Sequence, residues 1–100
     1  MITDENSSTI TADHIPSVTS GYRLQFEQAQ DTWVLLYPEG MVKLNQSAAE
    51  ILKRCDGIRS VTQVVTQLEQ DFEQKGLEND VLGFLTVARE QKWIKIADAE

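Results

Sequence analysis

The chain has 100 residues, of which 41% are hydrophobic, and its formal net charge is −7. This length and composition fit a single domain with one core and leave little material for an enclosed active-site cavity. The nine Lys and Arg residues are too few and too dispersed to neutralise nucleic-acid phosphates or an anionic membrane surface, so both partner classes are disfavoured.

Residues 1–20 are rich in Ser, Thr, Asp and Asn and show neither helical nor strand periodicity. Such a segment buries too little apolar surface to offset its ordering entropy, so we expect a flexible leader, then a globular domain at 21–96 and a polar tail at 97–100. The start lacks the basic and apolar segments of a secretory signal, and no apolar run is long enough to span a membrane. With Cys55 as the single cysteine, these features predict a cytoplasmic protein.

Three strands are expected first in the globular domain. Apolar and polar residues alternate from Tyr22 to Glu27, and the run Thr32–Tyr37 is β-branched and aromatic, which predicts two strands joined as a hairpin. Tyr37-Pro38-Glu39-Gly40 suits a type I turn leading into a short third strand, Met41–Leu44.

Three helices are expected next, because the apolar spacing changes to the helical period. The predicted helices cover residues 46–56, 61–73 and 78–91. Asn45 is a good N-cap, Ser60 with Gln63 makes a capping box, and Gly57 is placed to end the first helix in a left-handed conformation. Residues 92–96 alternate briefly, as a terminal packing segment or a stub of strand.

Gly83 lies inside the third predicted helix, where glycine costs about 1 kcal/mol relative to alanine. It either permits a close approach by another backbone or reflects tight packing within the fold. Acidic residues cluster between the second and third helices, either as a solvated face or as a patch that steers a basic partner. They are Glu69, Asp71, Glu73, Glu78 and Asp80.

Catalytic and metal-binding residues are scarce. His14 is the only histidine, lies in the expected leader and has no ligand partner at a suitable spacing, so no zinc site is predicted. Cys55 falls in an apolar helical pattern, which predicts a buried thiol. Without a base near any nucleophile, the sequence predicts no catalytic residue, no metal and no cofactor.

The third strand is an edge with one charge, Lys43, and no proline, so it is weakly defended against an incoming strand. If the third helix packs beside this edge, its apolar face would provide pockets while the strand provides main-chain hydrogen bonds, as in peptide capture by strand addition. The alternative is an edge covered by the protein itself or by a second copy.

One run of the sequence, YPEGMVKLN at Tyr37–Asn45, is highly specific for a single protein family. Further matching segments are Arg23–Asp31, Val34–Leu36, Ser47–Leu52, Cys55–Gly57, Asp80–Val81, Phe84–Leu85 and Lys92–Ile94. Over residues 21–96 these segments resemble the PqqD family, peptide chaperones of pyrroloquinoline quinone biosynthesis and a type of recognition domain for ribosomally made, modified peptides.

The resemblance implies an α+β, winged helix-turn-helix-like fold, with a three-stranded antiparallel sheet followed by three helices. It implies that the protein binds the precursor peptide of the quinone cofactor by strand addition and presents it to a radical S-adenosylmethionine enzyme. Peptides in this class bind between the third strand and third helix, here Met41, Val42, Lys43, Leu44, Asp80, Val81, Phe84, Leu85 and Ala88. Phe84 and Leu85 are equally consistent with the core.

The leading alternative is a DNA-binding winged-helix regulator, which would need a basic recognition helix. The third predicted helix instead has Glu78, Asp80 and Glu90 against Arg89 alone. A small-molecule enzyme is a more distant alternative because a nucleophile, base and metal set is missing. An open strand edge is compatible with a monomer or a homodimer.

Overall fold

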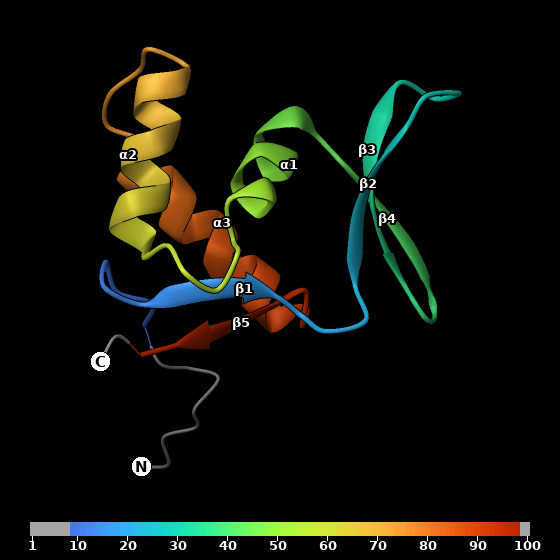
Figure 1. The fold of residues 1–100 in the computed structure, drawn as a ribbon, viewed down its shortest axis with the longest axis horizontal. Helices are drawn as coiled ribbons and strands as arrows, with labels where there is room; N and C mark the ends of the chain where they lie inside the picture. The colour runs from blue at the N-terminus through green and yellow to red at the C-terminus, as the bar shows by residue number, and fades with distance from the viewer. Residues whose placement is uncertain (1–8, 99–100) are drawn as a thin grey trace.

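The computed structural model describes residues 9–98, and in them the chain forms three helices and two antiparallel sheets. The elements are, in chain order, β1 (Ile15–Val18), β2 (Arg23–Glu27), β3 (Thr32–Tyr37), β4 (Gly40–Leu44), α1 (Gln46–Lys53), α2 (Val61–Asp71), α3 (Glu78–Glu90) and β5 (Ile94–Ala97). The predicted α+β class, with three helices and antiparallel pairing, is confirmed. Figure 1 shows the β2–β3–β4 sheet to one side of α1 and the β1–β5 ribbon beneath the helices.

The three-stranded sheet has the order β2-β3-β4, which matches the three predicted strands. Leu24, Leu35 and Val42 are cross-strand partners and so lie on one face. Leu35 is fully buried in the core, with Leu24 and Val42 packed against the same cluster. Because α1 contacts all three strands, this face joins the sheet to the helices.

Helix starts follow the predicted capping residues. The Asn45 side chain accepts a hydrogen bond from the Ala48 amide at 2.8 Å. Ser60 and Gln63 form the predicted capping box, in which each side chain accepts from the other residue's amide. Each cap provides a partner for an N–H group that has none inside the helix.

The helix ends differ slightly from the predictions, and α1 ends at Lys53. Gly57 has the expected left-handed backbone, with φ of +79°, but it lies in the loop beyond α1. Its amide donates to the Pro16 carbonyl at 3.0 Å, and a Cβ there would lie 3.4 Å from the Ser17 Cβ. Gly57 therefore lets this loop lie close against β1 rather than ending the helix.

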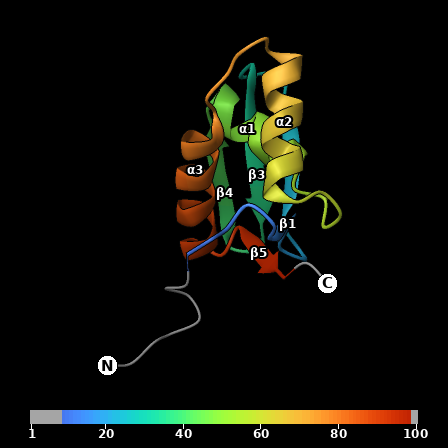
Figure 2. The same cartoon turned by 90° about the vertical axis from the view of Figure 1, so that its left-hand side faces the viewer.

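Residues 9–20 are not a flexible leader, which corrects the prediction for that part of the chain. β1 pairs with β5 from Ile15↔Ala97 to Val18↔Ile94, so Ala97 also belongs to the fold rather than to a tail. Ile10 is only 3% exposed and lies in the core. Residues 1–8 of the expected leader and 99–100 of the expected tail lie outside the described residues. Figure 2 shows β1 and β5 across one end of the helices.

The same segment completes the start of α2. The amides of Val61 and Thr62 donate to the carbonyls of His14 and Ala12, each at 2.9 Å. These two amides are among the first of the helix and have no partner within it. His14 is held as well, with Nδ1 accepting from the Thr11 amide at 2.9 Å and Nε2 lying 3.0 Å from Asp98 Oδ1. Ordering of residues 11–14 is thus coupled to capping of α2.

Cys55 is 4% exposed, and its thiol donates to the Ile51 carbonyl at 3.3 Å, which confirms the predicted buried thiol. Burial, with a smaller contribution from the Asp56 charge, raises the pKa of Cys55 from 9.0 to about 12. The thiolate is the reactive form of cysteine, so this thiol is inert while the protein is folded.

We therefore expect Cys55 to resist iodoacetamide in native buffer and to react at once in denaturant. Its folded pKa lies above its unfolded pKa, so the free energy of unfolding is unaffected below about pH 9 and falls as the pH rises from 9.0 towards about 12. Urea titrations at pH 8 and pH 10.5 measure this loss, and Cys55→Ala should show a smaller loss. Rapid alkylation of the native protein would contradict the prediction.

Candidate functional site

The outer edge of β4 is open, because within residues 9–98 this strand pairs only with β3. Tyr37 and Gly40 are partners across the turn. Along an antiparallel ladder, every second residue of a strand directs its N–H and C=O groups towards the neighbouring strand, and the residues between direct theirs away. Counting in steps of two from Gly40, Val42 directs its backbone groups towards β3, whereas Met41 and Lys43 direct theirs outwards. The part of the chain that the structure describes does not cover its own edge.

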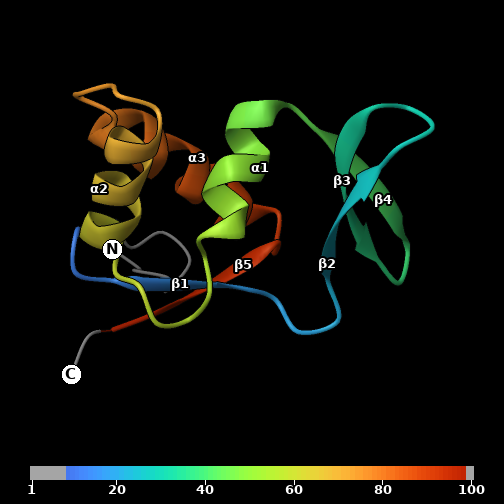
Figure 3. The same cartoon turned by 45° about the horizontal axis from the view of Figure 1, so that its top comes forward.

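A groove of about 490 Å³ adjoins the end of this edge; we call it the β4 groove. Its walls come from β4 and α3, and its floor comes from the first turns of α1. Figure 3 shows α1 between α3 and the three-stranded sheet. The lining residues are Lys43, Leu44, Asn45, Ser47, Ala48, Ile51, Asp80, Phe84, Val87 and Trp93.

The structure brings four of the predicted site residues together in this groove, namely Lys43, Leu44, Asp80 and Phe84. Met41 and Val42 lie further along β4, and the Met41 side chain is 47% exposed. The other three, Val81, Leu85 and Ala88, are at most 2% exposed and belong to the core. Those three support α3 from inside and do not line the β4 groove.

Sequence reasoning did not place Val87, Trp93 or the first turns of α1 at the site. Val87 is 48% exposed, although it stands on a helix whose opposite face is buried. The available signal was the width of the apolar pattern on α3, which exceeds what one buried face needs. Trp93 follows α3 and packs beside Phe84, with ring centroids 6.4 Å apart.

Gly83 lies on the exposed side of α3, and a Cβ built there meets nothing within 4 Å. Tight packing within the fold is therefore not the reason for this glycine, so that interpretation is wrong. Alanine would fit the space and stabilise the helix. The other interpretation, a close approach by another backbone, stays a prediction.

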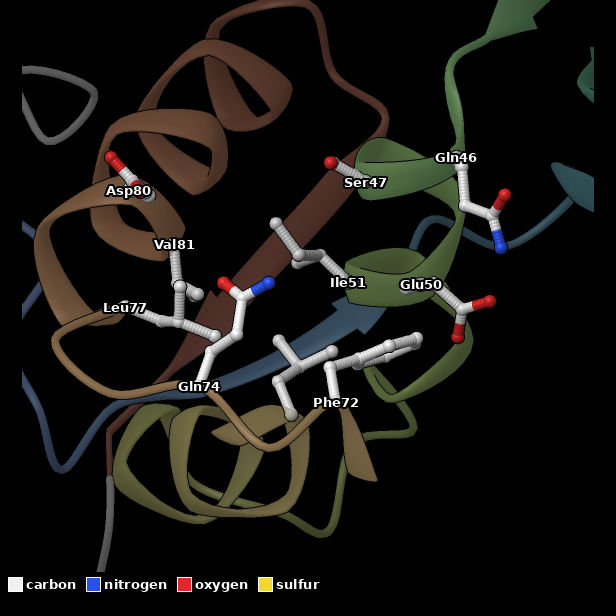
Figure 4. A pocket seen from close by; sticks show the side chains of 10 residues that line it. Gln46, Ser47, Glu50, Ile51, Phe72, Gln74, Leu77, Asp80 and Val81 are labelled. Carbon is white, nitrogen blue, oxygen red and sulfur yellow. The ribbon is translucent and has the colours of Figure 1, made fainter. Parts of the chain in front are cut away.

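A second groove, of about 380 Å³, lies between α1, the end of α2 and the start of α3; we call it the Phe72 pocket (Figure 4). Arg54 stabilises one side of it, because its guanidinium contacts Glu50 Oε1 at 2.9 Å and Asp71 Oδ2 at 2.7 Å. The hydrogen bond from Arg54 lowers the pKa of Glu50. These contacts join α1 to the end of α2, next to the pocket.

The acidic cluster has partly structural roles. Asp71 is paired with Arg54, and the Glu69 carboxylate accepts a hydrogen bond from the Leu77 amide at 3.0 Å. Glu78 and Asp80 occupy the first turn of α3, where negative charge favourably meets the helix dipole. With this acidic start and a single basic residue in its last turn, Arg89, α3 lacks the charge of a DNA recognition helix.

Neither a membrane span nor a metal centre is found in residues 9–98. No helix there is long and apolar enough to cross a bilayer. Among the same residues, His, Cys, Asp and Glu side chains do not gather in groups of three or more that suit a metal ion.

Comparison with known proteins identifies relatives of this fold and sequence. Residues 32–94 match the family model described as coenzyme PQQ synthesis protein D (PqqD). The chain is 53% identical over 90 residues to the PqqA binding protein of Azotobacter vinelandii, covering 89% of this chain and 98% of that protein. It is 54% identical over 85 residues to the PqqA binding protein of Pseudomonas aeruginosa, covering 84% and 92%.

A solved structure also matches, with a TM-score of 0.78 and 26% identity over 92% of this chain and 99% of the other. It is the solution NMR structure of the PqqD truncation of Methylobacterium extorquens PqqCD. That truncation is described as a functional, stand-alone recognition element for ribosomally synthesised and post-translationally modified peptides.

Proposed function

The chain belongs to the PqqD family, and from this premise we propose that it is a non-catalytic chaperone that binds the precursor peptide PqqA in pyrroloquinoline quinone biosynthesis. The observation that carries the proposal is the open edge of β4 beside the β4 groove. The peptide adds a strand to this edge, and its side chains enter the groove. Relatives named as PqqA binding proteins support the same role.

Main-chain and side-chain contacts have separate parts in this proposal. The N–H and C=O groups of Met41 and Lys43 hold the peptide backbone, which provides affinity for many sequences. Phe84, Val87 and Trp93 form an apolar wall that selects side chains. Leu85 and Ala88 act only by keeping α3 in place, since both are fully buried.

The finer parts of the proposal concern location, assembly and fold type. The chaperone works in the cytoplasm and presents the bound peptide to a radical S-adenosylmethionine enzyme. Its sheet and helices form a winged-helix-like arrangement, and the open β4 edge permits either a monomer or a homodimer. The absence of a basic recognition helix argues against the DNA-binding alternative.

Lys43→Pro tests strand addition directly, because proline removes an outward N–H and is tolerated on edge strands. Loss of one or two main-chain bonds predicts that peptide affinity falls by about 5- to 30-fold, measured by calorimetric titration with PqqA. The free energy of unfolding should change little.

Lys43→Ala is the matched control, since it removes the same charge but keeps the N–H, and we expect it to bind the peptide several-fold more tightly than Lys43→Pro does. An amide-shift map recorded during the titration should show the largest changes in β4 and α3. Equal affinity of Lys43→Pro and Lys43→Ala, or shifts confined to β1 and β5, would overturn strand addition.

A further inference from the structure

The β4 groove and the Phe72 pocket adjoin each other, because Ser47, Ile51 and Asp80 line both of them. We call the two together the furrow. The combined furrow starts at the open edge of β4, crosses the first turns of α1 and ends near Phe72, between α2 and α3. A chain bound at the β4 edge therefore meets a second cavity when it continues along the furrow.

The Phe72 pocket suits an apolar side chain. Its inner surface is formed by Ile51, Leu77 and Val81, and the Phe72 ring stands beside them. Figure 4 shows the Gln74 amide directed into the space between these groups. Phe72 is 42% exposed at the end of α2, with the Arg54 guanidinium 5.9 Å from its ring centroid, so part of the ring is accessible to a bound side chain.

The charged side chains around the furrow limit which kinds of peptide segment can bind there. Asp80 stands at the junction of the two grooves, and Glu50 lies at the rim of the Phe72 pocket. Glu50 is already paired with Lys53 and Arg54, whereas Asp80 takes part in no ion pair found within residues 9–98. An acidic segment would be repelled at the junction, and a neutral or basic one would be accepted.

We propose that a segment of the precursor peptide outside the added strand continues along this furrow and places an apolar side chain in the Phe72 pocket. The proposal rests on the proposed function, because it uses the same peptide and the same entry at β4. The segment that crosses Asp80 is neutral or basic. The peptide is thus held at two separated points, the β4 edge and the Phe72 pocket.

Phe72→Ala tests the second point of attachment, and Phe26→Ala is a matched control. The two rings are similarly exposed, at 42% and 40%, but Phe26 packs on Trp33 in the sheet and lines neither groove. We expect Phe72→Ala to weaken binding of full-length PqqA by about tenfold, and Phe26→Ala to leave it unchanged.

Peptides shortened from each end then separate the two sites. Trimming one end should weaken binding to the wild type by a similar factor and should remove the difference between wild type and Phe72→Ala. Gln74→Glu provides a second variant in case Phe72→Ala is poorly folded; its carboxylate enters the same pocket from an exposed position and should weaken full-length binding only.

Three outcomes are distinguishable. Equal binding of full-length PqqA by wild type, Phe72→Ala and Gln74→Glu would overturn the second attachment, as would an effect that persists with every shortened peptide. If Lys43→Pro also binds normally, strand addition itself fails. Loss of the Phe72 effect on trimming one end, with Lys43→Pro still impaired, would support both proposals.

Discussion

Replacing Ile10 with alanine is expected to lower the free energy of unfolding by about 2 to 4 kcal/mol. Ile10 is 3% exposed and lies in the same core cluster as Leu52 and Leu85. Loss of its side chain leaves a cavity and loosens the segment whose carbonyls cap α2. The result would be unexpected for a flexible leader, in which no single side chain affects stability.

Ile58→Ala is the matched control, since the same substitution is made at a side chain that is 79% exposed. We expect its free energy of unfolding to stay within about 0.5 kcal/mol of the wild type. Urea denaturation followed by circular dichroism measures both variants. Similar stabilities of Ile10→Ala and Ile58→Ala would show that residues 9–14 are not part of the core.

Leu85→Ala is expected to lower the free energy of unfolding by about 3 to 5 kcal/mol. Leu85 is fully buried, and its loss opens a cavity between α3 and the rest of the core. Peptide affinity should fall only in proportion to the fraction of unfolded protein, because the side chain does not line the β4 groove. Stability is measured by urea titration, and affinity by calorimetry below the melting temperature.

Val87→Ala should behave in the opposite way. Val87 is 48% exposed and lines the β4 groove, so we expect nearly unchanged stability and a loss of peptide affinity of about three- to tenfold. The pair compares two apolar residues two positions apart on the same helix. If Leu85→Ala instead weakened binding at full stability, the assignment of the two faces of α3 would be reversed.

Most elements could be predicted because their signals are local. Strands β2 to β4 alternate or are β-branched, and α1 and α2 begin at capping residues that form the predicted hydrogen bonds. β1 has no such signal, because it contains Pro16 and Ser17 and pairs with a strand at the other end of the chain. A four-residue strand stabilised by a distant partner is invisible to a periodicity argument.

The part of the site on β4 could be predicted from the sequence, whereas the part on α3 could be predicted less well. The open edge follows from the position and composition of β4, but an apolar pattern on α3 does not reveal which side meets the core. Val81 and Leu85 are buried, whereas Phe84 and Val87 line the groove, although all four are apolar. Only the packing of α3 on the other elements distinguishes the two faces.

The β1–β5 ribbon has a consequence for how the chain folds during translation, since it joins Ile15 to Ala97. During translation, β1 is made before the sheet and the helices that follow it, whereas its partner β5 is made after them. Pairs so distant in sequence form slowly because a long loop must close first. The helices and the β2–β4 sheet can form before β5 has been made, whereas β1 reaches its final place only when β5 is available. Until then, β1 and the segment around Ile10 are the parts of this domain most exposed to proteases.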